Sequence, residues 1–164
     1  MKARTRQSPK NTRRINDASD TEFPLDASVG ALVRYTHRAF ADDLQTHLQQ
    51  HEVNVGMWYF LRALWEDDGL TQRELSRLIG VSEPTAAQQL KKMEADQLIS
   101  RQPSTSDRRK IHVHLTQKGR ALRRKLIPYA LEVNAAATDG IDMQDLDHLR
   151  RTLEKILHNL SQRS

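Results

Sequence analysis

The sequence predicts a mainly α-helical protein with one small β-hairpin. Apolar residues recur at threes and fours over residues 26–51, which is the period of an amphipathic helix. Between Thr71 and Met93, residues typical of helix ends predict two shorter helices. Residues 111–115 then alternate apolar and polar side chains, as a half-buried strand does. Helical periods cover most of the patterned sequence, so the predicted fold class is mainly α.

Composition excludes several classes of protein. The chain has 164 residues, 37% of them apolar and 29% charged, which suits one domain or one subunit of an oligomer. It contains no cysteine, so disulfides, thiol catalysis and cysteine-ligated zinc are excluded. No apolar run is long enough to span a membrane, and the N-terminus lacks the apolar core of a signal peptide. We therefore expect a cytoplasmic protein with no membrane partner.

Two helices are predicted before the short helices that begin at Thr71. The helix over residues 26–51 carries an apolar stripe from Val29 to Leu48. The second helix runs from about Asn54 to Glu66 and is apolar over most of its circumference. We expect this second helix to be buried centrally.

Residues 69–93 predict two short helices joined by a tight turn. Thr71 and Glu74 have the spacing of a capping box, and Gly80 is placed to end the first helix. Ser82 is a good N-cap for the second helix. The positions predicted to be buried are Leu75, Leu78, Ile79, Ala86, Leu90 and Met93. This arrangement is a helix-turn-helix, whose second helix places its N-terminal residues in the major groove of DNA.

A β-hairpin follows the helix-turn-helix. Residues 98–101 begin one strand, residues 103–107 turn, and residues 111–115 return as the second strand. A hairpin in this position is a wing, and three adjacent cations at residues 108–110 stand at its tip. Such a tip can reach the DNA backbone or the minor groove. The residues predicted to lie on the outer surface of the wing are His112 and His114.

Two further helices are predicted after the wing. Thr116 caps the first, whose predicted packing residues are Leu122, Leu126, Ile127 and Leu131. The last helix lies between Asp142 and Gln162, and its apolar residues are spaced 3, 4, 3 and 4 apart, which forms an a/d seam. The seam consists of Leu146, Leu149, Leu153, Ile156 and Leu160. A seam needs a partner, so we expect a homodimer; packing within the chain is the alternative.

The order of these elements resembles the MarR family of bacterial winged-helix regulators over about residues 26–162. The most specific likeness is "DRRKIHVHLTQKG", in which Asp107, Arg109, Leu115, Thr116 and Gly119 stand at the family's spacing. The stretch "LTQRELSRLIGVSEPTAAQQLKKMEADQLI" resembles the family's DNA-reading unit. The resemblance implies a winged helix-turn-helix reading unit at residues 53–118. It also implies dimerisation helices at residues 25–52 and 119–164.

The resemblance also implies which residues meet double-stranded DNA. Arg109 is expected to enter the minor groove, with Asp107 orienting it. Gln88 stands where many relatives have arginine, and an amide reads adenine more naturally than guanine. The predicted DNA-contacting residues are Thr71, Ser82, Pro84, Thr85, Gln88, Gln89, Lys92, Asp107, Arg108, Arg109 and Lys110. The implied partner is a pseudo-palindromic operator bound by a two-fold dimer.

Family members mostly repress transcription, and small ligands release many of them from DNA. The resemblance places the ligand pocket where the first two helices and the terminal helices meet the reading unit. Cations beside aromatic rings there favour an aromatic carboxylate. The predicted effector-binding residues are Arg34, Tyr35, His37, Arg38, Trp58, Arg62 and Trp65. The alternative is that both tryptophans belong to the core and the arginines to the surface.

Charge is concentrated at the N-terminus. Six of the 26 basic residues lie in the first fourteen positions, which contain no acidic residue. Residues 15–164 therefore hold 20 basic and 21 acidic side chains, a formal charge of −1. Residues 1–24 are predicted to be a disordered basic arm and linker. The arm either adds contacts to DNA phosphates or is a solvated leader without a role; both interpretations stay open.

Other functions are weighed against this prediction. A constitutive or architectural DNA-binding protein without an effector shares every DNA-binding feature. A metal-responsive regulator would use His47 and His51, which stand four residues apart on a helix, but two histidines without a matched acid are a weak metal signal. Asp67 and Asp68 are adjacent, so they do not pair as catalytic carboxylates. We predict no enzymatic activity, no cofactor and no bound metal.

Overall fold

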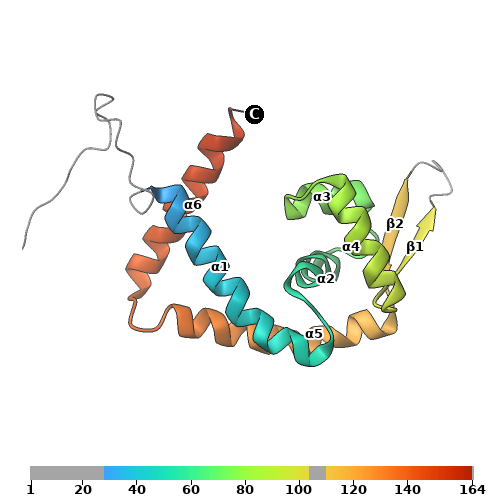
Figure 1. The fold of residues 1–164 in the computed structure, drawn as a ribbon. Coiled ribbons are helices and arrows are strands. Elements are labelled where there is room, and N and C mark those ends of the chain that lie inside the picture. Colours follow the sequence, from blue (N-terminus) through green and yellow to red (C-terminus); the bar gives the residue numbers. More distant parts are fainter. Residues whose placement is uncertain (1–27, 104–109, 164) are drawn as a thin grey trace, which may run out of the picture. The chain divides into compact units, whose positions relative to one another are not determined.

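A computed structural model of the chain describes residues 28–103 and 110–163 (Figure 1). The predicted arm and linker at residues 1–24 and the predicted wing tip at residues 104–109 lie outside the described residues. The observed elements are α1 (Val29–Leu48), the 3-10 helix η1 (Gln49–His51), α2 (Val55–Glu66), α3 (Gln72–Ile79), α4 (Glu83–Ala95), β1 (Ile99–Pro103), β2 (Ile111–Leu115), α5 (Gln117–Ala137) and α6 (Met143–Ser161). The predicted fold class, mainly α with a small β-wing, is confirmed.

Helix α1 crosses the boundary between two compact units, residues 1–36 and 37–164. In the first unit the Ser28 Oγ accepts a hydrogen bond from the Ala31 backbone N–H at 2.9 Å, which caps the start of the helix. Val29, Leu32 and Val33 are exposed in that unit.

In the second unit, Leu44 and Leu48 of α1 are buried. The α-helix then tightens into η1 and ends at Glu52, whose φ of 60° is left-handed. The single helix predicted over residues 26–51 is therefore an α-helix with a short 3-10 end. Its apolar stripe is buried toward the C-terminal end only.

Helix α2 forms the centre of the second unit, as its apolar circumference predicts. Asn54 caps it, because its Oδ1 accepts a hydrogen bond from the Met57 backbone N–H at 2.9 Å. The residues of α2 that are buried are Met57, Trp58, Phe60, Leu61, Leu64 and Trp65. The rings of Trp58 and Trp65 meet edge to face with centroids 5.7 Å apart.

Helices α3 and α4 form the predicted helix-turn-helix. Thr71 and Glu74 make the capping box, with the Thr71 backbone N–H donating to the Glu74 carboxylate at 2.8 Å. Gly80 ends α3 with a φ of 75°, a left-handed conformation that glycine adopts without strain. Ser82 caps α4 and Pro84 follows in its first turn. The predicted start and end of α3 and the predicted start of α4 are confirmed.

Burial on these helices differs from the prediction at Leu78 and, in part, at Ile79, which is half-buried. Leu75 of α3 and Leu90 and Met93 of α4 are fully buried, as expected. Replacing Met93 by alanine is expected to cost about 2–5 kcal/mol, because it empties a packed site. Leu78 was predicted to be buried but is 66% exposed, since it lies on the outer side of the short α3 helix.

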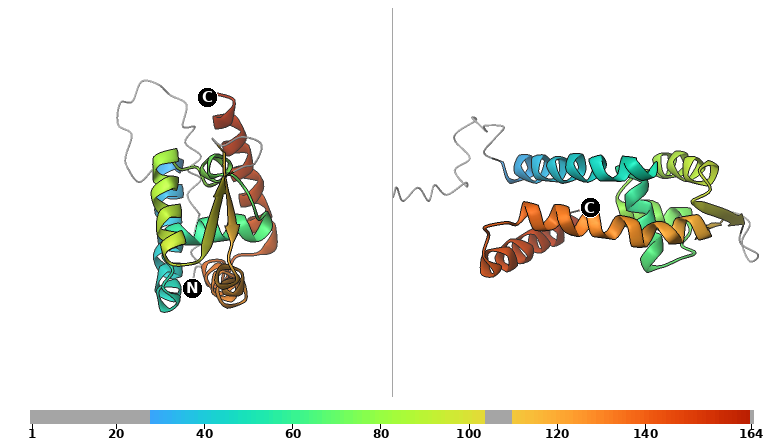
Figure 2. Two further views of the ribbon diagram at one scale, coloured as in Figure 1. Left: turned by 90° about the vertical axis from the view of Figure 1, so that its right-hand side faces the viewer. Right: turned by 90° about the horizontal axis from the view of Figure 1, so that it is seen from below.

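The two strands pair antiparallel, with Ile99 opposite Leu115 and Pro103 opposite Ile111. Figure 2 shows the two strands running side by side. The segment at residues 69–71, before α3, runs alongside β2 as a third extended segment and hydrogen-bonds to it. The Gly69 N–H donates to the Val113 carbonyl at 3.0 Å, and the Val113 N–H donates to the Leu70 carbonyl at 2.9 Å. This third run makes the base of the wing more rigid than a free hairpin.

The third run changes the environment of the wing histidines. His112 and His114 were predicted to lie on the outer surface, but both are half-buried. The His112 Nδ1 lies 2.8 Å from the Gly69 carbonyl oxygen. A Cβ on Gly69 would lie 2.8 Å from the His114 Cε1, so Gly69 leaves room for that ring. The histidines alternate with the buried Val113 and Leu115, as predicted, but residues 69–71 partly cover their side of β2.

Helix α5 begins directly at the end of the wing (Figure 1). Thr116 caps it, with its Oγ1 accepting from the Gly119 backbone N–H at 3.1 Å. A Cβ on Gly119 would lie 2.1 Å from the Leu98 carbonyl oxygen, so only glycine fits. The Trp65 Nε1–H donates to the Gly119 carbonyl at 3.0 Å. This turn therefore locks α2, the wing and α5 together.

The two C-terminal helices are less buried than α2. Leu122 and Leu126 of α5 are buried as predicted, and Ile127 is half-buried. Leu131 was predicted to pack but is 66% exposed, because no described element covers that side of α5. Helix α6 begins at Asp142 as predicted, and none of its residues is buried.

Candidate DNA-binding surface

The buried side of α4 decides which side chains face outward. Ala86, Leu90 and Met93 are fully buried against the core of the second unit. The Ser82 Oγ accepts from the Thr85 backbone N–H at 3.3 Å, which fixes the direction in which the helix leaves the turn. Because the inner side is apolar and buried, the opposite side of α4 is held outward in one orientation.

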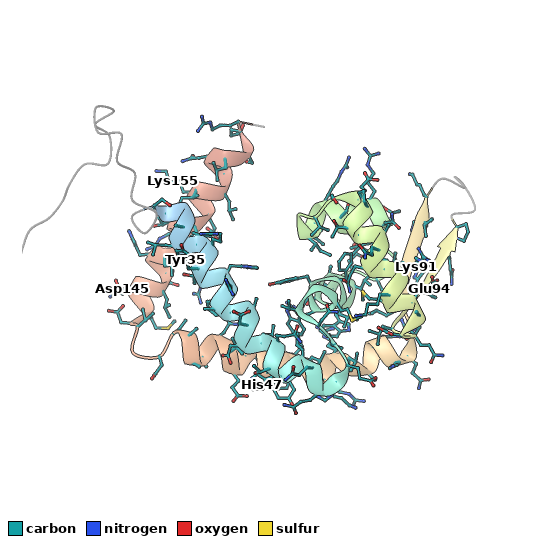
Figure 3. All side chains as sticks on the ribbon, viewed as in Figure 1. Tyr35, His47, Lys91, Glu94, Asp145 and Lys155 are labelled. Carbon is teal, nitrogen blue, oxygen red and sulfur yellow. The ribbon has the colours of Figure 1, made fainter. Side chains whose placement is uncertain are left out.

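The outward side of α4 carries most of the predicted DNA-contacting residues. The exposed residues are Ser82, Pro84, Thr85, Gln88 and Lys92. These side chains offer a hydroxyl pair, an amide and an ammonium group, which are the groups that bind base edges and phosphates. Lys91 is also exposed on α4 (Figure 3), and the sequence prediction missed it. The 3.6-residue period places Lys91 beside Gln88, so helical geometry could have found it.

Gln89 was predicted to contact DNA, but its side chain turns inward. It is half-buried, and its Oε1 lies 3.3 Å from the position that a Cβ on Gly56 of α2 would occupy. Its Nε2 is buried and has no hydrogen-bond partner among the described residues. This placement favours a role in the packing of α4 on α2.

The wing is described only up to its base. Asp107, Arg108 and Arg109, all predicted to meet DNA, lie outside the described residues. Lys110 is described and exposed. It lines a groove of about 580 Å³, which we call the α3–wing groove. The residues that line this groove are Thr71, Gln72, Arg73, Glu74, Arg77, Glu83, Lys110 and Ile111.

Thr71 was predicted to contact DNA, but its hydroxyl is already engaged. The Thr71 Oγ1 donates to the Glu74 carboxylate at 2.7 Å. This hydrogen bond, with help from the Thr71 backbone N–H, holds the pKa of Glu74 below its usual value. Thr71 therefore serves mainly to cap α3, at the edge of the α3–wing groove.

An ion pair joins α4, the second or recognition helix of the helix-turn-helix, to the wing. The Arg101 Nε donates to the Glu94 carboxylate at 2.9 Å and its Nη2 donates at 2.5 Å. The Arg101 backbone N–H donates to the same carboxylate at 3.3 Å. These hydrogen bonds lower the pKa of Glu94. Glu94 lies toward the C-terminal end of α4, beside the strands (Figure 3).

Asp68 holds the other strand of the wing. Its Oδ1 accepts from the Leu115 backbone N–H at 2.8 Å, and its Oδ2 accepts from the Arg120 guanidinium at 2.9 Å. The sequence prediction considered Asp68 only as a catalytic carboxylate. The structure shows that it joins the end of α2, the strand β2 and the first turn of α5.

The predicted effector residues are distributed over both units. In the first unit, the Arg34 guanidinium carbon lies 4.8 Å from the centroid of the exposed Tyr35 ring. In the second unit, the His37 Nε2 lies 3.1 Å from the Tyr59 hydroxyl. Arg38 pairs with Asp42 of the same helix.

The remaining predicted effector residues belong to α2. The Arg62 guanidinium lies 6.0 Å from the Trp58 ring centroid and pairs with Glu66 at 3.2 Å. Trp65 is 7% exposed and donates its indole N–H to Gly119, so it is a core residue. Trp58 is 6% exposed but lines a small pocket.

That pocket lies between α1, α2 and α5 within the second unit and has a volume of about 160 Å³. Its lining residues are Phe40, Ala41, Leu44, Trp58, Tyr59, Ala130, Val133 and Asn134. Trp58 and its neighbour Tyr59 are the two lining residues that the sequence placed near the effector region. Burial raises the pKa of the Tyr59 phenol, so the hydroxyl remains a neutral hydrogen-bond donor. The pocket therefore combines apolar walls with one phenol and one amide.

The seam residues of α6 are only partly covered. Leu146, Leu153 and Ile156 are half-buried, whereas Leu149 and Leu160 are 51% and 56% exposed. The described part of the chain leaves this apolar side open.

The histidines considered as metal ligands pack against an aromatic ring. The rings of His47 and Tyr129 stack with centroids 4.9 Å apart, and the His51 ring lies 5.8 Å from that of Tyr129. Within residues 28–103 and 110–163, no group of three or more metal-binding side chains is found. In the same ranges, no helix combines the length and apolarity needed to cross a bilayer.

Comparison with known proteins decides the family of the reading unit. The sequence model of the MarR family matches residues 53–111. The chain contains a MarR-family domain. The match covers α2, the helix-turn-helix and β1 and ends at the first residue of β2, and it confirms the resemblance seen in the sequence. Residues 53–111 therefore form a DNA-binding domain of the type found in MarR transcriptional regulators.

Similar proteins extend this likeness beyond the domain. TtmR, an HTH-type transcriptional regulator of Methylorubrum extorquens (strain PA1), is 25% identical over 150 residues, which cover 90% of this chain and 73% of TtmR. A MarR family transcriptional regulator from Listeria monocytogenes, solved with a 26mer DNA, superposes with a TM-score of 0.77 at 20% identity over 82% of this chain and 90% of that one. CouR from Rhodococcus jostii RHA1, solved with p-coumaroyl-CoA bound, superposes with a TM-score of 0.71 at 19% identity. The match covers 82% of this chain and 95% of CouR. The two structures establish the fold.

Proposed function

We propose that the protein is a homodimeric, cytoplasmic repressor that binds a pseudo-palindromic operator and is released from it by a small ligand. The observation that carries the DNA-binding part is the outward side of α4. Its polar residues are exposed while its opposite side is fully buried, so a rigid scaffold presents them. Helices with this geometry enter the major groove.

Within the proposed complex, Gln88 reads a base edge. Its amide is exposed at the centre of the outward side of α4, and an amide both donates to and accepts from adenine. Lys91 and Lys92 flank it and contact phosphates, which set position rather than sequence. Arg109 enters the minor groove with Asp107 orienting it; this part rests on the family resemblance alone.

The proposed dimer forms through the terminal helices, residues 25–52 and 119–164, while residues 53–118 read DNA. The exposed apolar side chains support this division. They include Leu32 at 57% and Leu157 at 68% exposure, together with the open seam of α6. Contiguous exposed apolar surface marks an interaction site. A two-fold dimer places its recognition helices about one DNA turn apart and so requires a pseudo-palindromic site.

The proposed effector site is the pocket between α1, α2 and α5. An apolar cavity of about 150 Å³ holds one benzene ring, so this pocket suits a single aromatic ring. The Tyr59 hydroxyl, hydrogen-bonded to His37, can donate to a carboxylate on that ring. The p-coumaroyl-CoA bound to CouR also supports an aromatic ligand. Loss of about 100-fold in operator affinity requires about 2.7 kcal/mol of coupling between the two sites.

The test is a gel shift with the DNA upstream of the protein's own gene, with unrelated DNA at the same salt as the control. We expect preferential binding to the upstream DNA and release by at least one aromatic acid. Specific binding that no ligand disturbs would favour a constitutive regulator, the alternative that shares all DNA-binding features. Equal binding to both DNAs would contradict operator recognition in this region.

A further inference from the structure

An ion pair between the two helices of the helix-turn-helix lies in the α3–wing groove. The Arg73 Nε of α3 is 3.5 Å from the Glu83 Oε1 of α4. Both side chains are well exposed, at 67% and 60%. Glu83 is the first residue of α4, so it stands at the end of the recognition helix that approaches DNA.

The charges of the groove fit a phosphodiester group. Arg73, Arg77 and Lys110 line it, and all three are exposed. Of its two carboxylates, Glu74 is committed to the capping box with Thr71. Among the residues that line the groove, the cations therefore exceed the available carboxylates. Within the described part of the chain, Glu83 is the one acidic side chain that holds a groove cation in an ion pair across the helices.

We infer that the α3–wing groove is a subsite for a phosphate of the DNA backbone, in which Glu83 competes with the phosphate for Arg73. In the free protein, Arg73 pairs with Glu83. On DNA, Arg73 turns to the phosphate, and Glu83 is left beside a negatively charged strand. Glu83 thus lowers affinity for every DNA sequence alike, which raises the share of binding that depends on base contacts. The inference rests on the proposed DNA-binding function.

The experiment measures binding of the full-length protein to a fluorescent mixed-sequence duplex at several salt concentrations. Glu83→Gln is expected to tighten binding about two- to fivefold at low salt, the range that loss of one exposed ion pair supplies. It should also steepen the slope of log affinity against log salt by up to about 1, because the wild-type Glu83 carboxylate, once freed on DNA, keeps a counterion that the variant releases. Glu132→Gln, the same charge change on an exposed residue of α5, is the matched control and should leave the slope unchanged.

Arg73→Gln separates this competition from a change in net charge. Alone it should weaken binding, and in the Arg73→Gln background the Glu83→Gln gain should disappear. A gain that persists without Arg73, or that Glu132→Gln reproduces, overturns the inference. Equal unfolding midpoints would show that all variants are folded, as expected for an exposed pair. Wild-type protein that fails to bind the duplex at low salt would instead contradict the proposed function.

Discussion

The Glu94 carboxylate of α4 holds Arg101 of β1 through the Arg101 Nε at 2.9 Å and the Nη2 at 2.5 Å. The two side chains are 38% and 26% exposed, so solvent screens the pair only in part. The recognition helix and the wing are thereby fixed to each other at one point, next to the residues that face DNA. The Glu94–Arg101 pair and the core packing together set the orientation of α4 relative to the wing.

Arg101→Gln should weaken operator binding by about five- to tenfold, which corresponds to about 1–1.4 kcal/mol. Strand β1 would then be held less firmly beside α4, and fixing it on binding would cost conformational entropy. The free energy of unfolding should fall by about 1 kcal/mol. Binding isotherms and urea unfolding of Arg101→Gln, Glu94→Gln and the double variant check this. Additive losses in the double variant would show that the pair does not act as a unit.

The contribution of the Glu94–Arg101 pair to the free energy of unfolding should depend on pH. Because the folded pKa of Glu94 is lowered, its contribution is present above the unfolded pKa of about 4.3 and is lost as pH falls through the folded value. Urea unfolding at fixed protein concentration should therefore separate wild type from Glu94→Gln at neutral pH, and the separation should shrink as the pH falls below the unfolded pKa. A separation that stays constant down to pH 3 would exclude the ionised carboxylate as its source.

Adjacent glutamines of α4 should respond differently to the same change. Gln88→Ala removes an exposed amide and should reduce the ratio of operator affinity to unrelated-DNA affinity. The expected reduction corresponds to about 1–3 kcal/mol of binding free energy. Gln89→Ala removes a half-buried amide that lies against α2, so it should leave that ratio unchanged. Parallel titrations of both variants with both DNAs provide the comparison. A loss of sequence preference in Gln89→Ala alone would reverse the assignment.

Leu149→Glu should convert the proposed dimer to monomers. Leu149 is 51% exposed in the chain, so the charge does not disturb its own helix but would be buried in the proposed seam. Arg151→Glu places the same residue on the exposed side of α6 away from the seam and is the control. Sedimentation equilibrium gives the molecular mass of each. A dimeric Leu149→Glu protein would argue that the seam packs within the chain.

Local signals in the sequence predicted the reading unit well. Thr71, Gly80, Ser82 and Asp142 mark helix ends through contacts with residues at most four positions away, and all four ends are confirmed. The apolar circumference of α2 likewise predicted its central burial. Such signals are readable because the interacting groups are neighbours along the chain.

Contacts between distant residues were not predictable in this way. Asp68 binds Leu115 and Arg120, and the 69–71 run covers the wing histidines, over separations that no local pattern marks. Gln88 and Gln89 are identical and adjacent in the sequence, yet the packing of α4 on α2 turns only one of them inward. The direction of a polar side chain depends on its tertiary neighbours. The sequence therefore predicted which helix carries the site more reliably than which of its side chains face outward.

Hydroxyl-radical footprinting of the protein on its own upstream DNA tests the central claim most directly. A dimeric winged helix-turn-helix predicts two protected segments related by a dyad, with centres about one helical turn apart. Gln88→Ala should weaken both segments equally, because each protomer contributes one α4. A single protected segment, or uniform protection along the duplex, would contradict the account.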